Sequence, residues 1–241
     1  MQTAQATLPG PYESYYGGKG ASGAAQTIIN HIRPHATYME LFVGNGTVFR
    51  CKKPATTTIL NDLNNFVFDD WRSTGFEFMN STIDFWNRDA TDILATYQFQ
   101  GDLQYCVYLD PPYPISSRSE GKERYECEMT DDDHRELLNV LRYLPDNVDV
   151  LISTYKNPIY AELLHDWHLV TFQAMTRRGP ATEYLYMNYV PDGRLHDYRY
   201  LGADRTDRQR IRRKIRREIA RLKNLPVAER NAIINAVSQL R

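Results

Sequence analysis

The chain has 241 residues, of which 42% are hydrophobic and 24% are charged, with a formal net charge of −1. This length allows a large domain with a buried core, so a small disulfide-stapled fold is not required. The three cysteines, Cys51, Cys106 and Cys127, lie far apart without metal-ligand spacing, and no apolar run is long enough to cross a membrane. Since the N-terminus also lacks the plan of a signal peptide, we expect a soluble, cytoplasmic protein with no metal site.

The charge is unevenly distributed along the chain. Residues 205–241 contain 12 lysines and arginines against three acidic residues, whereas the preceding 204 residues contain 17 against 27. An acidic body therefore carries a basic tail, and such a tail suggests a polyanionic partner. We expect two parts, a main domain over residues 1–200 and a helical extension over residues 201–241.

In chain order, the first elements alternate between helix and strand. A glycine-containing loop over residues 1–20 precedes a predicted helix at 21–33, a strand at 37–42, a turn into a helix at 44–49, a strand at 56–61 and a helix beginning within 63–71. This order predicts a parallel sheet that is covered by helices.

The second half predicts a closing hairpin and a helical tail. Further strands are expected at 104–109, 148–154, 168–173 and 183–189, with helices at 131–143 and 158–165. The last two strands are too close for a parallel crossover, so they should pair antiparallel. Thr130 and the aspartates after it fit a helix cap better than a metal site. In the tail, Thr206 and Gln209 predict a capping box, and Pro226 suits the first turn of a second helix.

A glycine turn follows the first strand, in ELFVGNGTVF (Glu40–Phe49). Glycines there let backbone amides approach a ligand, although a simple tight turn is an equally good interpretation. Asp62, 18 positions after Gly44 and just past the next strand, favours a binding site, because a carboxylate there can hold both hydroxyls of a ribose. Phe49 departs from the GxGxxG pattern, so a nucleoside without a pyrophosphate fits better.

The most specific motif is Asp110-Pro111-Pro112-Tyr113, which follows the predicted strand at 104–109. Ligands of open α/β sheets bind beyond the carboxyl ends of the strands. The two prolines would hold the Asp110 carboxylate rigidly, and Tyr113 offers a flat ring. An amino group on a planar heterocycle needs hydrogen-bond acceptors and a stacking face, which favours this interpretation over a proline-capped strand end.

Taken in order, YYGGKG, ELFVGNGTVF, NDLN and YLDPPY resemble the Dam-like family of DNA adenine methyltransferases, and TEYLYMNY is similar to the closing strand of that family. The resemblance covers roughly residues 15–189. It implies a Rossmann-like class I methyltransferase fold, with a mostly parallel seven-stranded sheet and an antiparallel closing hairpin, to which the basic helical tail is added. It also implies S-adenosylmethionine as cofactor and the N6 amine of a flipped adenine in DNA as acceptor.

The resemblance assigns roles to individual residues. Asp110 and the carbonyl of Pro111 would accept hydrogen bonds from the target amine, next to Pro112, while Tyr113 would stack on the base. The residues expected to bind the cofactor are Tyr16, Gly18, Lys19, Glu40, Phe42, Gly44, Gly46, Asp62 and Asp89. Among them, Lys19 would approach the methionine end, Asp62 the ribose and Asp89 the adenine, although a helix cap explains Asp89 equally well.

No long target-recognition insertion precedes the DPPY strand, although family members with strict specificity generally have one. Asp110 lies only 21 positions after Asp89. The remaining candidates for nucleic-acid contact are basic residues in the loop 114–129, the hairpin tip 176–182 and the tail, namely Arg118, Lys122, Arg124, Arg177, Arg178, Arg208, Arg212, Arg213, Arg216 and Arg217. Solvated loops and a tail docked on the acidic body are the alternatives. We therefore expect relaxed or very short sequence specificity.

Other acceptors and other classes of function stay open from the sequence. The same fold could methylate adenine in RNA or the N4 amine of cytosine, and the aspartate of the motif favours adenine only by family resemblance. A methyltransferase-fold DNA-binding subunit that needs a protein partner is the alternative from another class. The intact Asp110, Tyr113, Gly44 and Asp62 argue against an inactive site.

Overall fold

The computed structural model describes residues 11, 18–20, 23–75, 81–118, 125–176 and 179–240. The chain separates into two compact units, Met1–Tyr198 and Arg199–Arg241. Across the described parts of both units, no helix is at once long and apolar enough to span a membrane.

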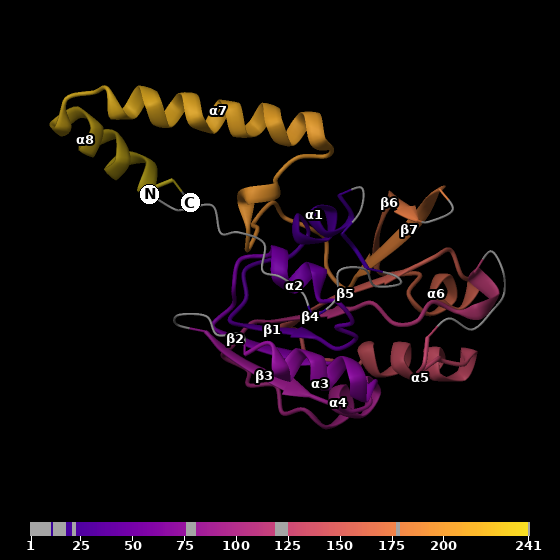
Figure 1. The fold of residues 1–241 in the computed structure, drawn as a ribbon. Coiled ribbons are helices and arrows are strands. Elements are labelled where there is room, and N and C mark those ends of the chain that lie inside the picture. The colour runs from indigo at the N-terminus through magenta and orange to yellow at the C-terminus, as the bar shows by residue number, and fades with distance from the viewer. Residues whose placement is uncertain are drawn as a thin grey trace. The chain divides into compact units, whose positions relative to one another are not determined.

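A seven-stranded sheet in the order β3-β2-β1-β4-β5-β7-β6 forms the centre of the first unit (Figure 1). Its strands are β1 (Thr37–Glu40), β2 (Thr57–Asn61), β3 (Thr82–Trp86), β4 (Tyr105–Leu109), β5 (Val148–Thr154), β6 (His168–Thr176) and β7 (Gly179–Met187). The first five pair in parallel, and β7 runs antiparallel between β5 and β6. The predicted mostly parallel sheet with an antiparallel closing hairpin is confirmed.

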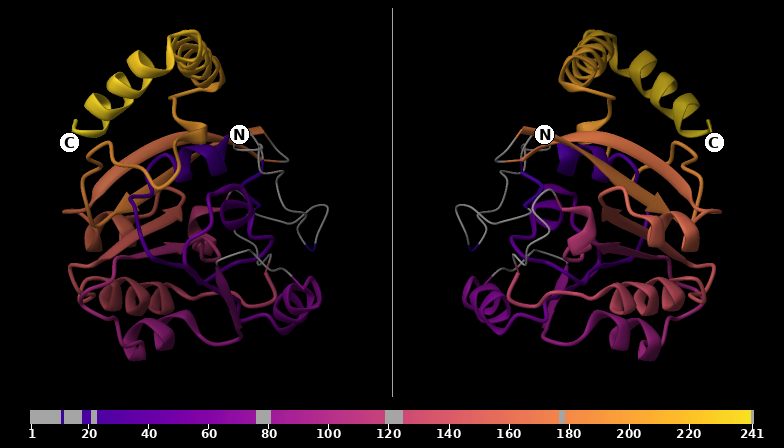
Figure 2. Two further views of the ribbon diagram at one scale, coloured as in Figure 1. Left: turned by 90° about the vertical axis from the view of Figure 1, so that its left-hand side faces the viewer. Right: turned by 90° about the vertical axis from the view of Figure 1, so that its right-hand side faces the viewer.

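Two details of the sheet differ from the sequence-based expectation. β3 was not predicted, because it is the edge strand and alternates exposed with half-buried residues instead of forming a buried apolar run. The hairpin strands are longer than expected, since pairing continues as far as Thr176 opposite Gly179. In the side views of Figure 2, β6 and β7 (orange) run together along this length.

Helices α4 (Ala90–Thr96), α5 (Asp131–Leu141) and α6 (Pro158–Leu163) cover one face of the sheet. Their apolar residues, including Ile93, Leu138 and Tyr160, share a core with Val107 and Ile152 of the central strands. Each helix begins at a short polar residue whose side chain accepts hydrogen bonds from the first amides, as at Asp89, Thr130 and Asn157. The predicted cap at Thr130 is confirmed, with a reciprocal bond from its backbone amide to Asp133.

The opposite face of the sheet carries polar side chains near the carboxyl ends of its parallel strands. Alternation along the strands places Glu40, Tyr108 and Ser153 outside the core just described. Tyr108 and Ser153 lie within hydrogen-bonding distance, with 3.1 Å between their hydroxyl oxygens. The remaining helices of this unit are α1 (Ala24–Ile29), α2 (Thr47–Cys51) and α3 (Asn65–Ser73), with 3-10 turns at Ile115–Ser117 and Tyr198–Tyr200, the latter reaching into the second unit.

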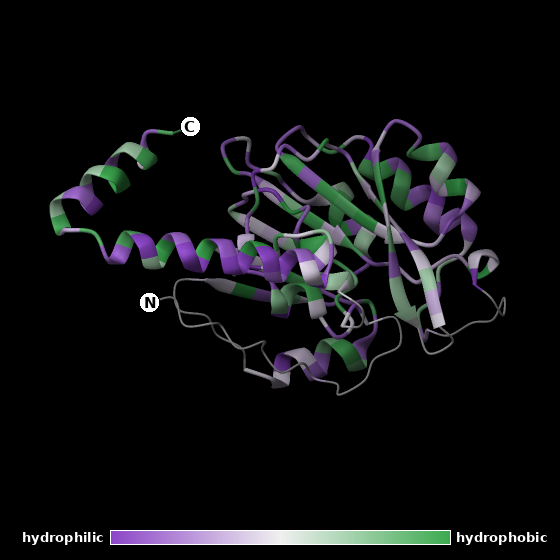
Figure 3. Ribbon diagram, turned by 90° about the horizontal axis from the view of Figure 1, so that it is seen from above, coloured by the Kyte–Doolittle hydropathy of each residue, from purple (hydrophilic) through white to green (hydrophobic). Residues whose placement is uncertain are grey.

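The second unit contains α7 (Arg205–Lys223) and α8 (Val227–Ser238). The predicted capping box of Thr206 and Gln209 is wrong. Asp204 caps α7 instead, and its carboxylate accepts a hydrogen bond from the amide of Asp207, since aspartate is a strong cap that also favours the positive helix end. Pro226 immediately precedes α8 rather than lying within its first turn. All residues of α7 and α8 are described and none is buried, and Figure 3 shows α7 as hydrophilic with separate hydrophobic bands.

Candidate active site

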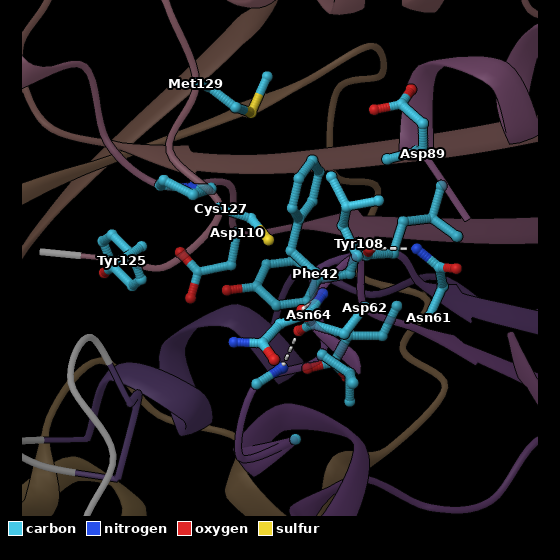
Figure 4. A pocket seen from close by; sticks show the side chains of 18 of the residues that line it. Phe42, Asn61, Asp62, Asn64, Asp89, Tyr108, Asp110, Tyr125, Cys127 and Met129 are labelled. Carbon is cyan, nitrogen blue, oxygen red and sulfur yellow. Dashed lines mark hydrogen bonds between the residues drawn. The ribbon is translucent and has the colours of Figure 1, made fainter. Parts of the chain in front are cut away.

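A cavity of about 600 Å³ is lined by the segments that follow β1, β2, β3 and β4 and by residues 125–129 (Figure 4). Asp62, Asp89 and Asp110 all contribute to it. The cavity therefore lies at the carboxyl ends of the parallel strands, where open α/β sheets bind their ligands.

The glycine turn after β1 is fixed by residues from two other segments. The amide of Gly44 donates to Asp62 Oδ2 (2.9 Å), and Trp71 Nε1 donates to the carbonyl of Gly44 (2.7 Å). Gly46 has a positive φ of 56° and starts α2, and a Cβ atom there would lie 2.5 Å from the ring of Trp71. Glycine is thus needed at position 46 for both conformation and space.

Glu40 joins the end of β1 to α2. Its Oε2 accepts hydrogen bonds from the hydroxyl of Tyr38 (2.7 Å) and the amide of Phe49 (3.0 Å). The side chain borders the cavity but is almost fully buried, and burial raises the pKa of Glu40 to about 8 against the opposing effect of these hydrogen bonds. Glu40 therefore stabilises the wall of the cavity by joining β1 to α2.

Asp62 holds two turns together at the end of β2. Besides the amide of Gly44, its carboxylate accepts a hydrogen bond from the amide of Asn64 (3.0 Å). Burial raises the pKa of Asp62, and the two backbone hydrogen bonds only partly offset this rise. Each carboxylate oxygen has a second lone pair, so Asp62 can still accept hydrogen bonds from hydroxyl groups of a ligand.

Asp89 both caps α4 and lines the cavity. Its Oδ1 accepts hydrogen bonds from the amides of Thr91 (2.8 Å) and Asp92 (3.1 Å). The cap is confirmed, while the contact with the adenine of the cofactor stays a prediction. The two roles are compatible, because one carboxylate oxygen serves the cap and the residue still faces the cavity.

Lys19 meets the DPPY motif at the end of β4. Its Nζ donates to Asp110 Oδ1 and to the hydroxyl of Tyr113, at 2.7 Å in each case, although 91 positions separate Lys19 from Asp110. Burial raises the pKa of Asp110, and Lys19 and Tyr113 oppose the rise. Burial lowers the pKa of Lys19, but the nearby carboxylates Asp110 and Glu183 outweigh it, so this pKa lies above its ordinary value. Lys19 therefore contacts the DPPY motif as well as lining the cavity.

Tyr113, the last residue of the DPPY motif, is buried rather than exposed on the surface. Its ring packs edge-to-face against Tyr155 with centroids 4.5 Å apart. Pro112 borders the cavity, whereas Pro111 is buried behind it. The fixed φ of the two prolines restricts the backbone after Asp110, while the stacking role of Tyr113 stays a prediction.

Arg118 is paired with a carboxylate of the same chain, and its contact with nucleic acid stays a prediction. Its guanidinium forms a bidentate pair with Glu128 at 2.7 and 2.5 Å, and its Nε donates to the carbonyl of Tyr113 at 2.7 Å. The side chain is only 7% exposed. Arg118 therefore links the DPPY motif to the cavity-lining segment 125–129. A guanidinium group can donate two parallel hydrogen bonds to one carboxylate, and this geometry favours the pair with Glu128.

The other predicted nucleic-acid contacts are only partly described. Lys122, Arg124, Arg177 and Arg178 lie outside the described residues, and so does Tyr16, which was predicted to bind the cofactor. The arginines of the tail lie along α7, where Arg212, Arg213, Arg216 and Arg217 are exposed and Arg208 is half-buried.

Sequence reasoning missed residues that join the separate motifs. Asn61 donates from Nδ2 to the carbonyls of Leu41 and Arg88, both at 2.9 Å, and so fixes three strand ends together. Asn64 Nδ2 donates to Glu126 Oε2 at 2.8 Å, which closes segment 125–129 over the cavity. The position of Asn61 directly before Asp62 was the only signal in the sequence for its role.

Comparison with protein families shows the family of this chain. The model for D12 class N6 adenine-specific DNA methyltransferases matches residues 15–74 and 69–177. The chain belongs to this family. It is a methyltransferase of the N6-adenine class with a Rossmann-like class I fold, and its cofactor is S-adenosylmethionine. A search of the curated proteins finds no match.

Several solved structures have a similar fold. A Haemophilus influenzae protein assigned as a methylase is 18% identical, with 68% of this chain and 84% of that chain covered and a TM-score of 0.41. The 23S rRNA methyltransferase ErmE is 14% identical, with coverage of 69% and 66% and a TM-score of 0.43. An S-adenosylmethionine-dependent methyltransferase from Agrobacterium tumefaciens is 12% identical, with coverage of 68% and 60% and a TM-score of 0.43.

The residues of the cavity suit this cofactor. The predicted cofactor residues within the described part of the chain all line the one cavity, namely Gly18, Lys19, Glu40, Phe42, Gly44, Gly46, Asp62 and Asp89. Its volume of about 600 Å³ is in the usual range for a ligand of this size. The glycine turn leaves backbone open to the ligand, Asp62 can accept hydrogen bonds from ribose hydroxyls, and Asp110 lines the same cavity.

Proposed function

We propose that this methyltransferase methylates the N6 amine of an adenine that is flipped out of DNA, with relaxed or very short sequence preference. The observation that carries the proposal is the position of Asp110. Its carboxylate is held by Lys19 at 2.7 Å and lines the same cavity as the cofactor residues.

Acceptor geometry explains why such a site would favour an exocyclic amine. The lone pair of an adenine amine is delocalised into the ring, so the amine is a weak nucleophile. Hydrogen bonds from its two N–H groups to Asp110 and to the carbonyl of Pro111 shift electron density back toward nitrogen. Bound S-adenosylmethionine supplies the electrophilic methyl group. The rigid Asp110-Pro111-Pro112 segment contributes chiefly orientation, which can account for a large part of the rate enhancement.

A flipped base needs a wall to replace the stacking that it loses in the duplex. Pro112 borders the cavity, and Tyr113 and Tyr155 form an edge-to-face aromatic pair next to it. We assign the base to this wall, with Tyr113 as the stacking ring next to Asp110.

The short connection before β4 supports weak sequence specificity. Between β3 and β4 the described chain contains only α4 and the connecting segments, so no further domain is inserted there. The cationic helix α7 offers contacts to phosphates, and such contacts position an enzyme without reading bases.

A transfer assay tests the acceptor. Full-length protein with labelled S-adenosylmethionine is offered duplex DNA, single-stranded DNA and RNA, and the products are digested to nucleosides. We expect N6-methyldeoxyadenosine from DNA. Asp110→Ala should lower kcat by about 100-fold or more with cofactor affinity kept. Asp102→Ala is the matched control, because Asp102 is exposed at the other end of β4 and should behave as wild type. Label in N4-methylcytosine, or in RNA alone, would refute the acceptor assignment.

Mapping methylated adenines on random-sequence DNA tests the specificity. We expect a preference limited to the adenine and its immediate neighbours. Methylation confined to sites with four or more fixed bases would show that another part of the chain, or a partner, reads sequence.

A further inference from the structure

Glu183 lies near the acceptor site, although the sequence analysis gave it no role beyond its place in the closing strand. It belongs to β7, whose pairing with β5 ends at Tyr184 opposite Thr154. The hairpin therefore extends beyond the carboxyl edge of the parallel strands. Glu183 and Leu185 point away from the core that contains Tyr186, toward the same face of the sheet as Tyr108.

The contacts of Glu183 lead to Asp110 through Lys19. The carboxylate of Glu183 is buried, and its Oε2 lies 3.6 Å from Lys19 Nζ, which in turn is 2.7 Å from Asp110 Oδ1. Glu183 Oε2 accepts no hydrogen bond within the described part of the chain. The side chains of Lys19, Asp110 and Glu183 are 5%, 18% and 7% exposed, so solvent screens their charges little.

When both carboxylates are ionised, the charges of this group do not cancel. Among the described residues it contains one ammonium group and two carboxylates. With a single carboxylate, the ammonium of Lys19 would neutralise Asp110 and weaken it as an acceptor. With two, the ammonium is shared, and one negative charge remains beside the place where the target amine binds.

We propose that Glu183 is a positioning residue for methyl transfer, which shares Lys19 with Asp110 and so leaves the acceptor site with one net negative charge. This inference rests on the proposed function, because it assumes that Asp110 holds the target amine. As the lone pair of the amine nitrogen bonds to the methyl carbon, the bond from that carbon to the sulfonium sulfur breaks and leaves a neutral thioether. Positive charge therefore develops on the nitrogen, which then releases one proton to the carboxylate of Asp110. A net negative site stabilises this charge, and fixed charges in a dry site act strongly on such steps.

The first test is Glu183→Gln, which removes the charge and keeps the shape. Single-turnover transfer to duplex DNA should slow by about 10- to 100-fold, while the Kd for S-adenosylmethionine changes less than about two-fold. Glu162→Gln is the matched control, because Glu162 is an exposed residue on α6, and it should leave the rate unchanged. Glu183→Asp keeps the negative charge but moves it farther from Lys19, so its rate should lie between those of the wild type and Glu183→Gln.

The decisive test is the double variant Lys19→Met/Glu183→Gln. It keeps Asp110 as the only charge of the group, so it should transfer methyl groups at least about five-fold faster than Glu183→Gln alone. A merely structural role for Glu183 predicts the opposite, since a second buried substitution would add its own loss.

A pH profile provides an independent readout. Burial raises the pKa of Glu183, with Lys19 opposing and Asp110 adding to the rise, and the phenols of Tyr108 and Tyr113 also face this group. The wild-type rate should fall as Glu183 is protonated on the acidic side, and the profile of Glu183→Gln should lack this step.

The inference is overturned if Glu183→Gln keeps more than half of the wild-type rate, if the double variant is no faster than it, or if the two pH profiles coincide. These failures are distinct from failure of the proposed function, which would show as wild-type protein that does not form N6-methyladenine in DNA.

Discussion

Replacing Gly46 with alanine should destabilise the fold and weaken cofactor binding together. The new Cβ atom would lie 2.5 Å from Trp71 Cζ2 and 2.9 Å from Cη2, and the residue would keep a φ of 56°. Trp71 cannot easily move, because it is buried, bonded to the carbonyl of Gly44 and packed against Phe49 and Phe85. Left-handed backbone strain costs about 1–2 kcal/mol and overpacking about 1–3 kcal/mol, so we expect a loss of about 2–5 kcal/mol.

Urea unfolding and calorimetric titration with S-adenosylmethionine measure the two effects. Gly101→Ala is the matched control, since a Cβ atom there meets nothing within 4 Å. Repeating Gly46→Ala in a Trp71→Phe background removes the atoms that clash, so its cost should fall to the backbone strain of about 1–2 kcal/mol. A loss below about 0.5 kcal/mol in the wild-type background, with unchanged affinity for the cofactor, would refute the claim that position 46 requires glycine.

Three further predictions address the cavity and the tail. Asp62→Ala leaves the amides of Gly44 and Asn64 without their acceptor, so it should lower unfolding free energy by about 1–3 kcal/mol and raise the cofactor Kd at least about ten-fold by calorimetry, unlike the exposed Asp69→Ala. Glu40 has a pKa of about 8 in the folded protein against 4.5 as the ordinary value, so the folded state binds more protons in this window and stability should fall as pH rises through it. Urea midpoints from pH 5 to pH 8 should show this fall, at most about 1.4 kcal/mol per pH unit from Glu40, and Glu40→Gln should remove it. The exposed arginines of α7 are replaced by glutamine in one variant, at Arg212, Arg213, Arg216 and Arg217. This variant should bind DNA more weakly, with cofactor affinity unchanged. The slope of log K against log salt concentration should fall in magnitude by up to about 0.9 for each phosphate that is no longer neutralised.

The sequence predicted the central strands because they are continuous buried runs. All residues of β4 and β5 are buried, and such runs are typical of parallel strands with helices on both faces. β3 lies at the edge and has no buried residue, so the same signal was too weak to place it. The start of α7 was missed for a related reason, because both Asp204 and Thr206 are good caps and only the geometry selects Asp204.

The candidate site also contains residues that the sequence predicted and residues that it did not. Motifs at the ends of β1, β2 and β4 were predictable, because parallel strands bring their carboxyl ends to one edge. The partners of those motifs were not predictable from spacing. Lys19 meets Asp110 across 91 positions, and Arg118 is occupied by Glu128 ten positions later in a loop that periodicity does not describe. A basic residue in such a loop looks free for phosphate in the sequence until its carboxylate partner is located.

The largely buried ion pairs of the described residues are of two kinds, which differ in the number of carboxylates around the cation. Arg33 with Asp149, and Arg118 with Glu128, are bidentate pairs in which a guanidinium group meets a carboxylate. Lys19 instead faces two carboxylates, Asp110 and Glu183. An uncompensated buried charge costs stability, so a purely structural ion pair at this point would be more stable with one carboxylate for the one ammonium group. The excess charge lies where the proposed reaction develops positive charge on the acceptor nitrogen, which gives a chemical reason for keeping an electrostatic arrangement that packing alone does not favour.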